Sequence, residues 1–189
     1  YWISLLCFLI PAGFCLSIYL KFKADLPKRL SDQIQLTGSL AAQDFKRTVR
    51  NNVQAIHNLA ERIEETDGEF YSYWKQDAQR LLIQNESLTF VELISEEGII
   101  KDIYPRIKNG PAIGLDITKL DYRYSDWKTK SELGLTNITN WLQLSQGGNS
   151  FLIDVPIYFE DTFDGTVTGG MNFNSEFDRL SYYLEDFAI

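Results

Sequence analysis

The sequence predicts an α+β fold: a long N-terminal helix leads into an antiparallel sheet with covering helices, and a transmembrane helix precedes both. Three observations support this prediction. Residues 1–20 are uncharged and mostly apolar, apolar residues recur every three or four positions through residues 31–66, and short β-type runs follow from residue 88 onward. Helical spacing of apolar residues predicts an amphipathic helix, whereas short apolar runs between turn residues predict strands.

The first segment has the length of a membrane span, because about 20 apolar residues cross the ~30 Å hydrocarbon core of a bilayer. We therefore expect a transmembrane helix over residues 1–22. An uncleaved signal sequence is the alternative, since no small-x-small cleavage site precedes the first lysines. Lys21, Lys23, Lys28 and Arg29 follow the span, and the positive-inside rule alone would place that side in the cytoplasm. The sequence by itself leaves the orientation open.

A long helix is predicted over residues 31–66, with Ser31 as its N-cap and Asp67-Gly68 as its stop. Its apolar stripe consists of Ile34, Ala41, Phe45, Val49, Val53, Ile56, Ala60 and Ile63. Such a stripe can pair with a second copy of the chain, giving a homodimer, or pack on the chain's own globular part. The pattern fits both, and both can hold over different turns.

The globular core is predicted over residues 69–175, within a domain that covers residues 24–189. We expect a second helix at 69–84, strands at 88–94 and 99–104, a helical or irregular segment at 117–134, and strands at 151–159 and 165–173. Two strands, a helical excursion and further strands are the order of a PAS-like domain, in which helices cover one face of the sheet and a pocket lies on that face. An exit helix at 176–189 would lead toward a second transmembrane span.

Composition excludes several classes of function. The chain has 26 acidic and 18 basic residues, a formal net charge of −8, which argues against nucleic-acid binding because that needs a basic face. Cys7 and Cys15 both lie in the N-terminal apolar stretch, and His57 is the only histidine. We therefore expect no disulfide framework, no zinc site built on cysteine or paired histidines, and no cysteine nucleophile in the rest of the chain. No metal and no cofactor are predicted.

Three groups of short motifs occur in order in the second half of the chain. They are IIKDIYP and NGPAIGLDI within Ile99–Ile117, ELGLTNITNWLQLSQGGNSFLIDVPIYF over Glu132–Phe159, and GTVTGGMNF over Gly165–Phe173. This series resembles the CHASE family of extracellular sensor domains, found in sensor histidine kinases, diguanylate cyclases and related receptors. The resemblance implies a PAS-like domain outside the bacterial inner membrane, in the periplasm or outside the cell. It also implies that ligand binding is transmitted across the membrane through the flanking helices.

In members of this family that bind cytokinins, a threonine of the Leu-Thr element and an acidic residue on the preceding helix contribute to the pocket. Thr139 matches the threonine, and its hydroxyl can donate to a ligand or bond to the backbone. Arg123 stands where the acid would be, so the resemblance does not favour an adenine-type ligand. Because a guanidinium binds carboxylates and phosphates through two parallel hydrogen bonds, we expect an anionic small molecule. The other predicted ligand-binding residues are Tyr104, Arg106, Lys128 and Tyr158.

The favoured function is thus small-ligand sensing by a domain with no catalytic centre, whose output, a kinase or nucleotide cyclase, lies outside this chain. A membrane-anchored hydrolase that uses carboxylates such as Glu92, Asp116 and Asp154 is a second possibility. No nucleophile elbow, phosphate-binding loop or metal-ligand spacing accompanies these acids. Acids that alternate with apolar residues in strands normally mark the solvent face, which weakens the hydrolase hypothesis.

A protein-interaction module is the third possibility. In this case the long helix and aromatic residues such as Trp74 and Trp127 would contact a periplasmic partner. An enclosed pocket beside Arg123 and Thr139 distinguishes the hypotheses. Its presence would favour a small ligand, and its absence would favour a partner protein.

Overall fold

The computed structural model describes residues 2–174 and 177–178, with side chains from residue 9 onward. The predicted exit helix at 176–189 lies outside the described residues, except for residues 177 and 178. The chain divides into two compact units, residues 1–45 and residues 46–189. Each unit is described by itself.

The first unit consists of the N-terminal part of helix α1 (Trp2–Glu65). The predicted helix start at Ser31 is wrong, because α1 continues through Pro27 and the residues around it. Ser31 therefore lies inside a continuous helix and does not cap its start. Side chains of residues 9–45 are exposed or half-buried. Among the described residues, no helix combines the length and the apolar character needed to cross a membrane.

The second unit is an α+β domain, as predicted. After α1, which ends before a turn at Asp67 (φ 47°) and Gly68 (φ 80°), the chain forms helices and strands in this order: η1 (Glu69–Ser72), α2 (Trp74–Gln84), β1 (Leu88–Ser95), β2 (Ile100–Tyr104), α3 (Arg106–Asn109), η2 (Gly110–Ala112), η3 (Ile117–Lys119), α4 (Asp121–Glu132), β3 (Asn137–Ile138), β4 (Leu142–Gln143), β5 (Asn149–Phe159) and β6 (Thr162–Met171).

The strands form one antiparallel sheet in the order β2-β1-β6-β5-β3, and β4 pairs with β5 beside this path. The long strands β5 and β6 form a hairpin, with a turn at Glu160 and Asp161, both of which have positive φ. The turn predicted between β1 and β2 is present, and Gly98 there has a φ of 80°. The short strands β3 and β4 were not predicted, because two-residue pairings leave no alternation in the sequence.

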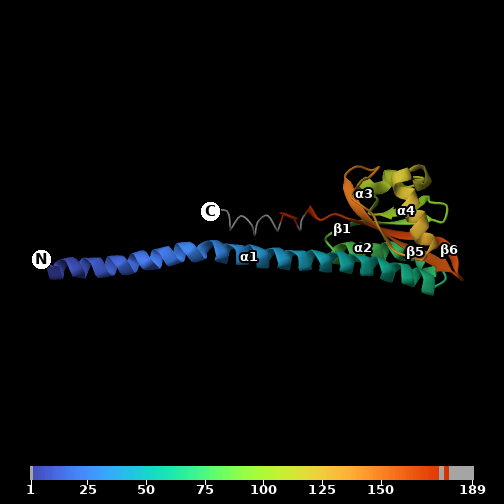
Figure 1. Cartoon of the computed structure of the whole chain (residues 1–189). Helices are drawn as coiled ribbons and strands as arrows, with labels where there is room; N and C mark the ends of the chain where they lie inside the picture. Colours follow the sequence, from blue (N-terminus) through green and yellow to red (C-terminus); the bar gives the residue numbers. More distant parts are fainter. Residues whose placement is uncertain (1, 175–176, 179–189) are drawn as a thin grey trace. The chain divides into compact units, whose positions relative to one another are not determined.

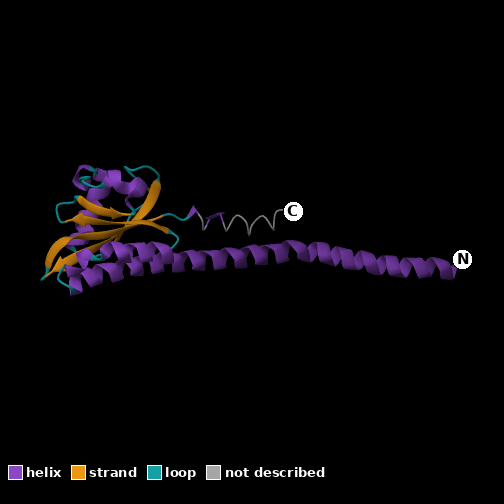
Figure 2. Cartoon of the chain, turned by 180° about the vertical axis from the view of Figure 1, so that it is seen from behind, coloured by secondary structure: helices purple, strands orange, loops and turns teal. Residues whose placement is uncertain are grey.

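Helices lie on both faces of this sheet (Figures 1 and 2). One face packs on α2 and on the second-unit part of α1 and forms the larger apolar cluster, whose buried members include Ile56, Leu59, Ile63, Trp74, Ala78, Val91, Leu93, Ile153, Val155 and Val167. The other face packs on α4 and on the segment that connects it to β2. The prediction of covering helices on one face only was therefore incomplete. Helix α4 covers one face of the sheet, and α1 and α2 cover the opposite face.

The alternating directions of the side chains along β1 match this arrangement. Val91 and Leu93 belong to the cluster under α1 and α2, whereas Phe90 and Ile94 belong to a smaller cluster under α4 that includes Trp127. Successive side chains of a strand point to opposite faces. A strand that is apolar on both faces is buried on both, so β1 lies in the interior of the domain.

Gly170 of β6 pairs in register with Phe90 of the neighbouring strand β1. A Cβ atom added at Gly170 would lie 2.2 Å from the ring of Phe90. The absence of a side chain on β6 at this position leaves the space that the Phe90 ring occupies.

Candidate ligand-binding site

A row of polar side chains crosses the α4-facing side of the sheet. Glu92 of β1 pairs in register with Thr168 of β6, Thr168 with Asp154 of β5, and Asp154 with Asn137 of β3. None of these four side chains, here called the polar row, is more than 5% exposed. Neighbouring strands lie about 4.8 Å apart, so the Cα atoms of Glu92 and Asp154, two strands apart, are separated by about 10 Å. The sheet therefore holds two buried acids at a fixed spacing.

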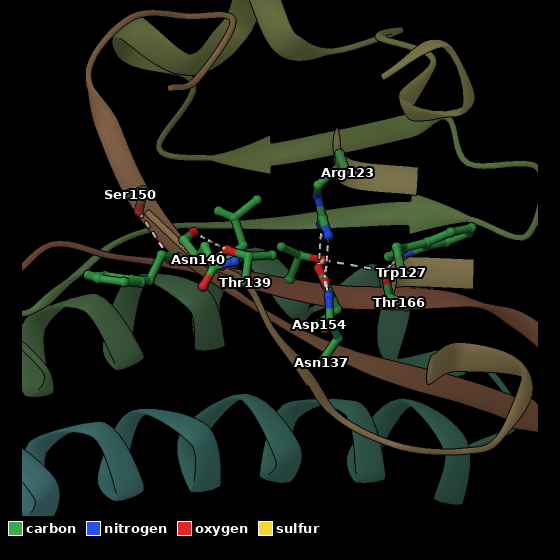
Figure 3. A network of polar contacts seen from close by, with 11 residues as sticks. Arg123, Trp127, Asn137, Thr139, Asn140, Ser150, Asp154 and Thr166 are labelled. Atoms are coloured by element: carbon green, nitrogen blue, oxygen red, sulfur yellow. Dashed lines mark hydrogen bonds and ion pairs between the residues drawn. The ribbon is translucent and has the colours of Figure 1, made fainter. Parts of the chain in front are cut away.

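Asp154 has partners for both of its carboxylate oxygens. Oδ2 accepts from Nη1 of Arg123 at 2.5 Å and from Nδ2 of Asn137 at 2.9 Å. Oδ1 accepts from Oγ1 of Thr168 at 2.7 Å and from Nη2 of Arg123. Figure 3 shows Arg123 pointing toward Asp154, with Asn137 approaching from the other side. Two parallel contacts between a guanidinium and a carboxylate are a strong, geometrically specific pairing.

This pairing changes the role expected of Arg123. The side chain is buried, and its charge is offset by Asp154. The reason given for an anionic ligand, a guanidinium free to bind it, therefore does not hold. Sequence spacing does not show that Arg123 and Asp154, 31 residues apart, meet.

Helix α4 is positioned over the sheet by residues that recur every four positions. Its buried residues are Arg123, Trp127 and Ser131, and residues four apart lie on one helix face. Nε1 of Trp127 donates to Oγ1 of Thr166 at 3.0 Å, and the indole packs edge-on against Phe163. The Arg123–Asp154 ion pair and the Trp127 side chain thus help to hold α4 on the sheet.

A cavity of about 40 Å³ opens beside the polar row. Its charged lining residues are Glu92 and Arg123, and the segment 142–146 forms part of its wall. The apolar lining residues are Phe90, Ile100, Leu115, Ile117, Leu120, Leu142, Leu144 and Leu152. A water molecule needs about 10–15 Å³ by this measure, so the cavity holds roughly three water-sized groups. A ligand as large as an amino acid requires the wall, such as segment 142–146, to move outward.

Glu92 differs from Asp154 because its carboxyl group has no partner. It is 4% exposed, and within the described part of the chain it forms no hydrogen bond and no ion pair. Burial raises the pKa of Glu92 from 4.5 to about 7; Arg123 opposes the rise and Asp154 adds to it. Because buried polar groups in folded proteins are nearly always hydrogen-bonded, an unpartnered carboxyl group that lines a cavity is a candidate binding group.

Of the six predicted ligand-binding residues, Arg123 lines the cavity and the others do not. Thr139 bonds to the backbone: Oγ1 donates to the carbonyl oxygen of Asn140 at 2.8 Å and accepts from the amide of Leu152 at 2.9 Å. This was one of the two roles considered for it. Thr139 lies beside the network in Figure 3 and stabilises the connection after β3.

The remaining four residues have partners elsewhere in the chain. Tyr104 packs against the apolar cluster on the opposite face. Arg106 and Lys128 each form an ion pair with an acid four residues away, at 3.0 and 3.3 Å. The hydroxyl of Tyr158 donates to a backbone carbonyl of α4. Their contribution to ligand binding stays a prediction.

The expectation that the strand acids face solvent is wrong for Glu92 and Asp154, which are 4% and 1% exposed. Helices cover both faces of the sheet, so neither face of these strands is open. The sequence contains the signal: in FVELI, apolar residues lie on both faces of the strand, which indicates burial on both. The alternation of acids with apolar residues was by itself too weak a criterion for predicting that these acids face solvent.

The acids of the domain do not form a metal site in the part that the structure describes. No group of three or more His, Cys, Asp or Glu residues there is arranged to hold an ion. Asp116, the third acid considered for hydrolysis, caps η3 by accepting from the amide of Thr118 at 3.0 Å. It also forms an ion pair with Lys119 at 3.1 Å, so its carboxylate stabilises a local turn.

No protein-family model matches the chain, and no curated protein matches its sequence. Several solved structures match its fold. An extracellular ligand-binding receptor from Desulfohalobium retbaense is 17% identical, with a TM-score of 0.65 over 78% of this chain and 27% of its own. The ligand-binding domain of the Pseudomonas aeruginosa amino acid chemoreceptor PctC, in complex with GABA, is 14% identical, with a TM-score of 0.60 over 79% of this chain and 66% of its own. The sensor domain of the histidine kinase DctB from V. cholerae is 11% identical, with a TM-score of 0.57 over 82% of this chain and 59% of its own.

The matching structures are thus ligand-binding and sensor domains of chemoreceptors and histidine kinases, and this chain shares their fold. The predicted PAS-like architecture is confirmed. At these identities the likeness shows the fold alone, and the chain spans between 27% and 66% of the length of these three structures. The CHASE family in particular is not shown.

Proposed function

We propose that this chain is the extracytoplasmic, small-molecule-sensing domain of a membrane-bound receptor. The cavity beside the polar row supports this proposal most directly, because it lies on the α4 face of a sheet whose fold matches that of solved sensor domains. Small-molecule sites are concave and mostly apolar, with a few placed polar groups. The cavity has this composition. The sequence criterion for a small ligand was an enclosed pocket beside Arg123 and Thr139, and the cavity meets it in part, since Arg123 lines it and Thr139 does not.

The receptor context is the second part of the proposal. Solved neighbours include a chemoreceptor and a histidine kinase, and the CHASE-like motif series favours a histidine kinase or diguanylate cyclase as the output. We infer that residues 1–22 attach the domain to the inner membrane and that residues 46–189 lie outside it. The neighbours are sensor domains rather than enzymes, which supports a domain with no catalytic centre.

Helix α1 is the proposed connection to the membrane and the proposed dimer contact. Ile56 and Ile63 pack on the sheet of their own domain. In the first unit, by contrast, Ile34 and Leu40 are 50% and 56% exposed. We propose that these turns pair with α1 of a second copy, and that ligand binding shifts the pair between two arrangements. Light scattering of the full chain should report a dimer that Ile34→Glu with Leu40→Glu converts to a monomer.

Thermal unfolding with a compound library tests the sensing function. The full chain, purified in detergent, is screened against amino acids, organic acids, amines and nucleobases. A ligand at 100 times its dissociation constant should stabilise the domain by about 2.7 kcal/mol. Arg123→Ala is a poor test variant, because it leaves Asp154 buried without its cation.

Ser145→Trp is the better variant, since Ser145 is exposed at the cavity wall and a bulky side chain there obstructs the cavity without removing a core contact. Ser125→Trp, at an exposed position of α4 that does not line the cavity, is the matched control. We expect a stabilising compound whose effect is lost in Ser145→Trp and kept in Ser125→Trp. No stabilising compound, or equal stabilisation of both variants, would contradict the proposed site.

A further inference from the structure

The two charged side chains that line the cavity differ in whether their charge is free to interact with a ligand. The guanidinium of Arg123 is held by both oxygens of Asp154, and the two charges offset each other. The carboxyl group of Glu92 has neither a hydrogen bond nor an ion pair in the described part of the chain. The charge available to a bound molecule is therefore that of Glu92.

The surroundings of Glu92 indicate which kind of ligand group would pair with its carboxylate. The charged groups that influence it are Arg123 of α4 and Asp154 of β5. Its register neighbours, Ile103 of β2 and Thr168 of β6, do not titrate. Ionised Glu92 thus lacks a hydrogen-bond donor and a nearby unpaired positive charge. A cation that carries N–H groups supplies both.

We propose that Glu92 binds the ammonium group of a small amine, while the apolar part of the amine lies against the leucine and isoleucine walls of the cavity. This inference rests on the proposed function and deepens it by naming the ligand class. A cavity of about 40 Å³ holds roughly three water-sized groups, enough for an ammonium nitrogen and two carbons. A longer amine extends past segment 142–146. A carboxylate ligand would instead place a second anion beside Glu92.

This ligand class has a pH signature. The amine binds ionised Glu92, whereas burial raises the pKa of Glu92 to about 7 in the free protein. At pH 6 the carboxyl group is mostly protonated and must release its proton when the amine binds. Between pH 6 and pH 8 the ionised fraction rises about tenfold, and the affinity should rise by the same factor.

Titrations of the full chain with matched probes test the inference. Ethylamine and putrescine are the amines, acetate and succinate are the acids, and ionic strength is held constant. We expect both amines to bind, about tenfold more tightly at pH 8 than at pH 6. Glu92→Gln should weaken amine binding at pH 8 at least tenfold. Glu97→Gln, which removes an acid that is 62% exposed in the β1–β2 turn, should leave it unchanged.

Binding of acetate or succinate in preference to the amines would overturn the inference while keeping the cavity as the site. Equal amine binding by wild type and Glu92→Gln would also overturn it. If none of the four probes binds but a library compound without an amino group does, with its effect lost in Ser145→Trp, the inference fails and the proposed function stands. If no library compound binds, both fail.

Discussion

The two faces of the sheet are built from different kinds of contact. The face under α1 and α2 is a continuous apolar cluster that includes Ile56, Leu59 and Ile63. The face under α4 has a smaller apolar cluster around Trp127, and the polar row crosses the sheet beside it. Both faces are buried, but only the α4 face contains buried acids at the centre of its strands.

This difference indicates a division of roles. Apolar burial stabilises by roughly 25 cal/mol per Å² and needs no particular partner geometry. Buried polar groups contribute little net stability and become costly when a partner is missing. The α1/α2 face therefore supplies most of the stability of the domain. The α4 face keeps a directional set of groups that suits recognition.

The largest effect is expected from Asp154→Ala on the α4 face. Removing this carboxylate leaves Arg123 buried without a counter-charge, which should cost about 3–5 kcal/mol in the free energy of unfolding. Urea denaturation measures the change, with the exposed acid Asp126 mutated to alanine as the control. A cost below about 1 kcal/mol would show that the ion pair is not formed in the folded protein.

On the apolar face, Ile63→Ala should cost about 2–5 kcal/mol, because it removes a fully buried side chain and leaves a cavity. Ile83→Ala on α2, where the side chain is 73% exposed, should be nearly neutral. Ile63→Ala should leave the affinity for any ligand of the α4 face unchanged at temperatures where the protein stays folded. A large loss of affinity would contradict the separation of roles between the faces.

Glu92→Gln should make the domain more stable at high pH. The pKa of Glu92 is raised from 4.5 to about 7 in the folded state, so the folded protein binds this proton more tightly than the unfolded chain. The stabilising contribution of protonated Glu92 to the folded state is therefore fully present below pH 4.5 and is lost as the pH rises through 7. Relative to its value at low pH, the stability of Glu92→Gln minus that of wild type should increase by about 3 kcal/mol by pH 8. Denaturation curves from pH 4 to pH 8 measure this difference, and a pH-independent difference would contradict the burial of Glu92.

A smaller effect is expected from Gly170→Ala, about 1–3 kcal/mol of destabilisation, because the added methyl group meets the ring of Phe90. In a Phe90→Leu background the cost of the same change should shrink, since the ring is absent. Gly110→Ala, where an added Cβ has no neighbour within 4 Å, is the control. Equal costs for Gly170→Ala in both backgrounds would rule out the contact with Phe90 as the cause.

Much of the fold could be predicted because it follows from local patterns. The apolar spacing of α1, the Asp67-Gly68 stop and the runs of β1, β5 and β6 are visible in the sequence. The start of α1 was not predicted correctly, since Ser31 has the residue type of an N-cap but lies inside a helix that begins at Trp2. Strands β3 and β4 have two residues each, and their pairing depends on tertiary contacts.

The site was predicted less well, because it depends on which side chains meet across the sheet. Arg123 was singled out, but its pairing with Asp154 joins residues that only the sheet and α4 bring together. Glu92 was assigned to solvent because acids that alternate with apolar residues in strands normally face solvent, but its side chain is buried under α4. Thr139 was matched through the family resemblance, and its hydroxyl bonds to the backbone.

Backbone hydrogen exchange of the full chain tests most directly whether the α4 face is the binding face. Exchange is compared with and without the library compound that gives the greatest thermal stabilisation. We expect the largest local protection in residues 115–123 and 142–146, which contribute to the cavity wall, and only the uniform slowing that follows from higher global stability in α2 and the second-unit part of α1. Local protection confined to α1 and α2 would contradict this assignment and place the ligand on the apolar face.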